Sequence, residues 1–251
     1  MKRRSRGFTR IEILIVLGVA IALGAVAVTL TKTSRARTHQ VNTLARMKAL
    51  GAAFSTYVNE KNGAMPYESG VGGDGWARAA KPENQEVWYN ALPKLMDAPG
   101  VGEIGVDKPE AFYESSYPLQ VPGAKYPPKP SRLEAPAFAI GMNSQLRKKN
   151  EGAAQMQGRF GQIQAPEKTV VFLERGLPKE RPAVTGQAGF DGSPKADARA
   201  FVARHNQKGI LVFADGHAEA CAASGIFNKS GDIVTPQTRI VWTLKSESNP
   251  N

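Results

Sequence analysis

The pattern of apolar and polar positions divides the chain into an apolar N-terminal stretch and a mostly polar remainder. Residues 13–30 are eighteen consecutive residues without a charge or a proline. At a helical rise of ~1.5 Å per residue this stretch is ~27 Å long, close to the ~30 Å hydrocarbon core of a bilayer. The pattern therefore predicts a transmembrane helix, which we place at residues 8–31.

Apolar residues continue beyond this stretch at intervals of three and four, which is the spacing of one helix face. They are Val41, Leu44, Met47, Leu50, Phe54, Tyr57 and Val58. Asn62-Gly63 is a helix-ending signal. We therefore expect one helix of about fifty residues, in which residues 32–60 pack against a head domain.

The remainder, residues 61–251, is expected to form that head. Its first part, residues 63–135, is rich in Gly and Pro, which excludes long regular elements, although 88–93 indicates a short apolar helix or turn. Four runs rich in β-branched, aromatic and other apolar residues then predict strands; these are 137–140, 169–173, 209–213 and 240–242. The predicted fold class is α+β, with a long N-terminal transmembrane helix packed on a β-rich head with long loops.

The distribution of charge bears on orientation and partners. The net charge is +11, and residues 1–7 carry four cations and no acid. A basic flank before an apolar helix favours a cytoplasmic N-terminus, so the head is expected outside the cytoplasm in a single-pass inner-membrane protein. No dense basic patch with interleaved aromatics is present, so no nucleic-acid partner is expected. The single cysteine, Cys221, excludes an intramolecular disulfide and a metal site of paired cysteines.

Two alternatives concern the start of the apolar run. It is longer than the 7–15 residues of a secretory signal, although Ala25-Val26-Ala27 fits the small-x-small pattern of ordinary signal cleavage. Glu12 places a carboxylate at the border of the run. Such a group either remains among lipid headgroups or pairs with a cation.

The segment Gly7-Phe8-Thr9-Arg10-Ile11-Glu12 before an apolar helix resembles the type IV prepilin signal, the class III leader of pilins and type II secretion pseudopilins. The resemblance implies a leader of residues 1–7, cleavage between Gly7 and Phe8 by a prepilin peptidase on the cytoplasmic side, and N-methylation of Phe8. It also implies that Glu12 guides assembly with other subunits through the N-terminal helix, into a type IV pilus on the cell surface or a secretion pseudopilus. Arg10 departs from the pattern, since an apolar residue is usual there.

A second constellation lies at His205, Asp215 and Gly216. The residues between them predict a tight loop at 206–209, a buried strand at 210–213 and a hairpin turn in which Gly216 takes a positive φ. His205 is then expected near the same sheet edge, hydrogen-bonded to backbone or to an acid.

Three roles are open for this constellation: a structural hairpin, an acid–base pair, or a metal site formed by His205, Asp215, His217 and Glu219. No Ser, Cys or second carboxylate stands at a spacing that supports catalysis, and no full ligand set is apparent. The sequence therefore favours the structural role, no enzyme activity and no cofactor.

His205, nine residues and then Asp215-Gly216 resemble the prepilin-type processing-associated His…Asp-Gly family of planctomycete- and verrucomicrobium-like bacteria. Residues 88–92, 139–143 and 165–170 resemble the same family. The resemblance implies a pilin-like or pseudopilin-like structural subunit. The alternative is a membrane-anchored extracytoplasmic domain that captures a glycan or a metal through loops 63–135 and the His205 hairpin, and never polymerises.

Overall fold

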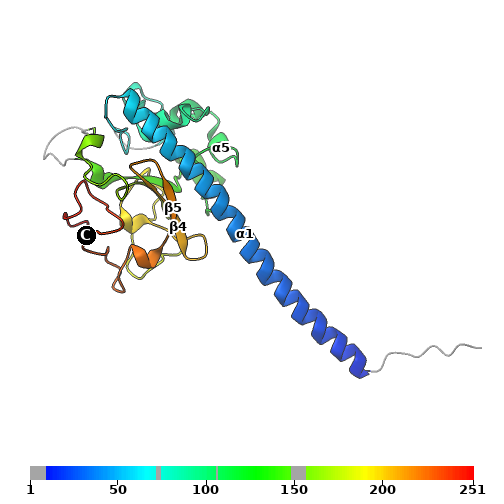
Figure 1. Ribbon diagram of the computed structural model, residues 1–251. Coiled ribbons are helices and arrows are strands. Elements are labelled where there is room, and N and C mark those ends of the chain that lie inside the picture. The colour runs from blue at the N-terminus through cyan, green and yellow to red at the C-terminus, as the bar shows by residue number, and fades with distance from the viewer. Residues whose placement is uncertain (1–9, 72–74, 106, 148–156) are drawn as a thin grey trace, which may run out of the picture. The chain divides into compact units, whose positions relative to one another are not determined.

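The computed structural model describes residues 10–71, 75–105, 107–147 and 157–251 (Figure 1). The chain forms two compact units, Met1–Thr38 and His39–Asn251. Helix α1, Arg10–Glu60, contributes residues to both units and is 51 residues long. The predicted leader, residues 1–7, and the predicted cleavage site between Gly7 and Phe8 lie outside the described residues.

The membrane predictions require correction. Within the part of the chain that the structure describes, no helix combines the length and the apolar character needed to cross a membrane. The transmembrane helix predicted at residues 8–31 is therefore wrong, and so is the single-pass inner-membrane location derived from it. Beyond the predicted span, helix α1 carries exposed charges at Arg35, Arg37 and Lys48.

In the second unit, the C-terminal part of α1 forms one wall of the main hydrophobic core. The buried residues follow the spacing of one helix face; they are Met47, Leu50, Ala53, Phe54, Tyr57 and Val58. Phe54 meets Phe172 edge to face, with ring centroids 5.9 Å apart. Arg46 donates hydrogen bonds to the carbonyls of Tyr117 and Gln120 and so ties the helix to the loop that contains them.

Short helices occupy the Gly/Pro-rich region among its described residues. They are α2 (Trp76–Ala79), α3 (Trp88–Lys94), α4 (Val101–Ile104), α5 (Pro109–Phe112) and α6 (Lys129–Glu134). The expected short apolar helix at 88–93 is confirmed by α3. Its Trp88 and Tyr89 are fully buried and pack against Phe138, which anchors these loops on the core.

The fold is α+β and contains a five-stranded mixed sheet in the order β3-β1-β2-β4-β5. The strands are β1 (Ile140–Asn143), β2 (Val170–Glu174), β3 (Lys195–Ala196), β4 (Lys208–Phe213) and β5 (Ala218–Ala222). β1 pairs with β3 in parallel, and the other neighbouring pairs are antiparallel. Figure 1 shows β4 and β5 beside the second half of α1.

Both faces of the sheet are covered, because side chains alternate along each strand. In β4, Ile210 and Val212 join the core that contains α1, whereas Leu211 and Phe213 join a second core under the C-terminal segments. Two strand predictions at 169–173 and 209–213 correspond to β2 and β4. The run 137–140 meets β1 only at Ile140, and 240–242 forms no strand but a single bridge between Val241 and Thr169.

Candidate functional site

The N-terminal part of α1 carries an exposed apolar stripe. Ile11, Leu14, Leu17 and Ile21 are 69, 65, 56 and 66% exposed. Residues at this spacing lie on one side of a helix, and we call these four the stripe. Val19 is also 53% exposed and lies on the opposite side, so the exposed apolar surface is not confined to the stripe. Glu12 belongs to α1, but its side chain lies outside what the structure describes. The stripe is therefore apolar surface that is available for contact.

His205 is held inside the head by a carboxylate. It is 1% exposed, and its Nε2 lies 3.2 Å from Oε1 of Glu174, the last residue of β2. Its backbone N–H donates to the Lys208 carbonyl at 2.8 Å, which closes the tight turn at Asn206 and Gln207, both of positive φ. The expectation that His205 hydrogen-bonds to an acid is confirmed, and the acid is Glu174.

Glu174 also serves two other buried donors. Its Oε2 accepts from Ile210 N at 2.8 Å, and its Oε1 accepts from Arg204 Nη1 at 3.2 Å. Arg204 continues to Glu180, with Nη2 2.5 Å from Oε2. Burial raises the pKa of Glu180, but the hydrogen bonds and charge of Arg204 outweigh it and hold that pKa below its ordinary value. Paired buried charges of this kind fix one arrangement of the strands, since each partner would be costly alone.

This charge cluster, Glu174, Glu180, Arg204 and His205, was only partly visible in the sequence. His205 was identified, but its partners come from the end of β2 and from the loop that follows it. The available signal was the carboxylate of Glu174 directly after an apolar run, because an acid at the end of a buried strand needs a buried partner.

The Asp215-Gly216 turn sits against helix α1. Asp215 Oδ1 accepts from the N–H of His217 at 3.1 Å, and Gly216 has a φ of +92°, which confirms the predicted hairpin turn. A Cβ at Gly51 of α1 would lie 2.9 Å from Val212 Cγ1 and still closer to the Gly216 carbonyl oxygen. Glycine at both positions therefore allows helix and turn to approach backbone to backbone.

The four candidate metal ligands do not converge. His205 precedes β4 and Asp215 follows it, so the six residues of β4, at ~3.3 Å each, separate them by roughly 20 Å. His217 Nδ1 is 2.6 Å from Asp215 Oδ1, and Glu219 accepts a hydrogen bond from Cys221 Sγ at 3.2 Å. Among the described residues no group of three or more His, Cys, Asp or Glu side chains is placed to hold a metal ion.

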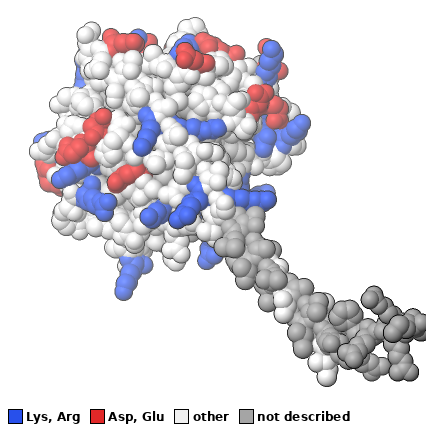
Figure 2. Space-filling model, turned by 45° about the vertical axis from the view of Figure 1, so that its right-hand side comes forward, with Lys and Arg blue, Asp and Glu red and all other residues white. Residues whose placement is uncertain are grey.

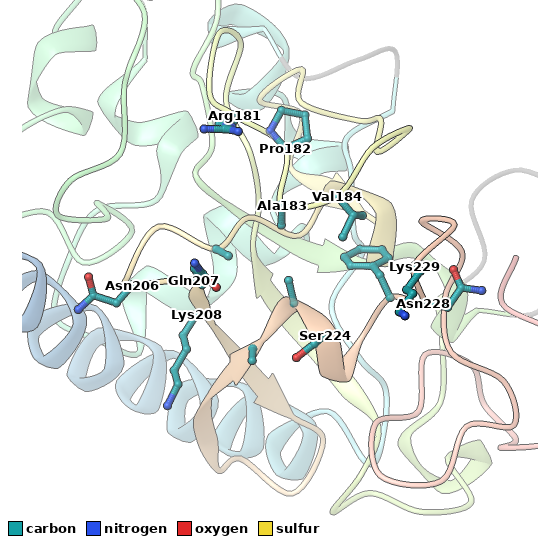
Figure 3. A pocket seen from close by; sticks show the side chains of 14 residues that line it. Arg181, Pro182, Ala183, Val184, Asn206, Gln207, Lys208, Ser224, Asn228 and Lys229 are labelled. Atoms are coloured by element: carbon teal, nitrogen blue, oxygen red, sulfur yellow. The ribbon is translucent and has the colours of Figure 1, made fainter.

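A large cavity opens beside the start of β4. It has a volume of about 790 Å³ and is bordered by three segments of the second unit, residues 181–184, 203–208 and 222–229 (Figure 3). Arg181, Lys208 and Lys229 lie on its border, and no acidic residue lines it. Sequence reasoning missed this site, because its residues come from three separate segments without a motif. Its volume is in the range of small-molecule sites, ~300–1,000 Å³.

Comparison of the chain with protein-family models, with curated proteins and with solved structures gave no match.

Proposed function

We propose that the protein is a pilin-like or pseudopilin-like structural subunit. In this proposal a prepilin peptidase cuts the chain between Gly7 and Phe8, Phe8 is N-methylated, and subunits assemble through helix α1 into a type IV pilus or a type II secretion pseudopilus. The observation that carries the proposal is the exposed apolar stripe of α1, Ile11, Leu14, Leu17 and Ile21.

The stripe supplies a driving force for assembly. Complete burial of a large aliphatic side chain contributes ~1.5–3 kcal/mol. Each of the four is already partly covered, so burial of the rest against a neighbouring helix contributes on the order of 1–2 kcal/mol per side chain. Association costs ~4–15 kcal/mol in lost freedom of motion. A single pair of stripes therefore gives weak association, and a filament, in which each helix touches several others, gives stable association.

In this proposal Glu12 sets how far neighbouring α1 helices are shifted along one another in the filament. It lies one residue after the first member of the stripe, and a carboxylate next to a helix–helix contact is stable there only with a partner. The α-amino group created by cleavage before Phe8 is such a partner on a neighbouring subunit. In this proposal the charge cluster around Glu174 and the Asp215-Gly216 turn have structural roles in the head.

Mass spectrometry of the protein produced together with a prepilin peptidase tests the processing step. The expected chain begins with N-methylated Phe8. An intact leader, or a chain that begins after Ala27, would refute the proposal.

The assembly step is tested by Glu12→Ala with recovered filament as the readout. Breaking a buried charge pair costs ~3–5 kcal/mol, so filament yield should fall by more than about tenfold. Glu60→Ala is the matched control, since Glu60 is an exposed carboxylate at the other end of α1. Equal yields for the two variants would show that Glu12 has no role in assembly.

A further inference from the structure

The cavity beside β4 has basic side chains and no acidic side chain on its border. Figure 2 shows Lys and Arg side chains interspersed with Asp and Glu over one face of the head. The wall of the cavity instead contains Arg181, Lys208 and Lys229 and no acid. All three side chains are exposed, and none forms an ion pair with a carboxylate in the described ranges of the chain. Their charges are therefore available to a ligand.

The three cations are spread around the cavity. Lys208 begins β4, Arg181 follows the buried Glu180, and Lys229 follows Asn228 in a loop near the C-terminal end. Figure 3 shows them on different sides of the opening. The arrangement fits a ligand that carries several anionic groups along its length.

The uncharged residues of the cavity wall indicate the chemistry of the ligand between its anionic groups. Asn206 and Gln207 occupy a turn with φ values of 49° and 64°, which leaves both amide side chains exposed at the border. Amides both donate and accept hydrogen bonds and so suit hydroxyl groups. The apolar part of the wall is formed by small side chains together with Phe227; the small ones are Ala183, Val184, Ala203, Ala222 and Ala223. Phe227 is only 3% exposed.

This wall distinguishes between classes of polyanion. Single-stranded nucleic acid is held by exposed aromatic rings on which the bases stack, and the one aromatic ring of this wall is buried. Sugar rings need hydroxyl partners and shallow apolar contact for their C–H groups, both of which the wall offers. We propose that the cavity binds an acidic polysaccharide, with the carboxylates of successive uronate residues on Arg181, Lys208 and Lys229. The proposal does not depend on filament assembly.

Isothermal titration of the full-length chain with tetragalacturonate tests the proposal. Binding should weaken as salt rises, because the cations are exposed. Removal of one cation, as in Lys208→Ala, should weaken binding about fivefold, which corresponds to ~1 kcal/mol. The triple variant R181A/K208A/K229A should show no measurable binding. Lys168→Ala is the matched control, since Lys168 is exposed and lies outside the cavity, and it should bind as the unchanged chain does.

Three further ligands make the outcome decisive. The methyl ester of tetragalacturonate keeps the sugar rings and loses the charges, so it should not bind; equal binding would refute the charge argument. Tighter binding of tetraglutamate or of a single-stranded DNA oligonucleotide would overturn the polysaccharide assignment. Unchanged binding by the triple variant would show that the cavity is not the site. Thermal unfolding of each variant checks that the head remains folded.

Discussion

Gly51→Ala puts a methyl group at the contact between α1 and the β4–β5 turn. In an exposed helix this change would stabilise the protein by ~0.8–1 kcal/mol, because glycine is the poorer helix former. At Gly51 the new Cβ would lie 2.9 Å from Val212 Cγ1, 3.0 Å from the Gly216 carbonyl carbon and closer still to its oxygen. Two of these neighbours are backbone atoms, so the turn itself must move.

The turn has little room to move. Its own Gly216 faces Ser55 on the same helix, where a Cβ would lie 2.8 Å from Oγ. Overpacking of a well-filled core costs ~1–3 kcal/mol and occasionally more. Because backbone must shift, we take the upper half of this range and subtract the helix-propensity gain, which leaves a net loss of about 1–2 kcal/mol.

Urea unfolding followed by circular dichroism measures this loss as a lower midpoint at an unchanged slope. Ala52→Gly calibrates the propensity contribution, because Ala52 is the next residue of the same helix and is exposed; it should destabilise the protein by ~1 kcal/mol. The opposite outcome is that Gly51→Ala raises the urea midpoint by as much as Ala52→Gly lowers it. Helix propensity alone would then account for the change in stability, and this result would refute the close contact with the turn.

Two predictions concern the charge cluster. Glu174→Gln leaves a single acceptor oxygen for Arg204, His205 and the N–H of Ile210. The free energy of unfolding should therefore fall by ~2–3 kcal/mol in the same urea assay. Glu219→Gln is the half-exposed control, and a loss for Glu174→Gln no larger than that of the control would contradict the pairing. The pKa of Glu180 in the folded protein lies below its ordinary value. Ionised Glu180 therefore stabilises the fold above ~pH 4.3, the pKa of Glu in the unfolded chain, and this stabilisation is lost as the pH falls through the pKa of the folded protein. Glu180→Gln should therefore flatten the loss of stability measured below about pH 4.3, and an unaltered pH profile would refute this role.

Local features of the fold could be predicted where neighbouring residues determine the structure. The tight turn after His205 and the positive φ of Gly216 follow from turn chemistry. The short helix at Trp88 follows from an apolar run between loops. The membrane prediction rested on the apolar run at 13–30 alone, and no helix among the described residues meets the combined requirement of length and apolar character.

Two strands show why pairing was harder to predict. β5 is Ala218–Ala222, without a β-branched or aromatic residue, and it is a strand because the Gly216 turn folds it back on β4. The run at 240–242 has good strand formers, yet the N–H of Trp242 donates to the Gln237 side chain at 2.6 Å instead of to a neighbouring strand. Side-chain competition of this kind leaves no periodic signal.

The site residues also divide into those that a local sequence pattern predicts and those whose partners are distant in sequence. His205 stood out as a histidine near a turn, but its partner Glu174 is distant in sequence. The cations of the cavity come from two loops and the first residue of β4, which only the folded chain brings together. The apolar run at 13–30 lies within α1 as expected, whereas the assignment of residues 8–31 to a lipid environment was wrong.

The contact between Gly51 and Gly216 has a consequence for synthesis on the ribosome. The two glycines are 165 positions apart (216 − 51). At ~5–20 residues per second, the turn is therefore synthesised on the order of 10–30 s after the part of α1 that it covers. Met47, Leu50 and Phe54 are without their strand partners during that time. The emerging chain is then exposed to aggregation, and slower translation before β4 would prolong that period, whereas a chaperone that binds apolar helices would protect it.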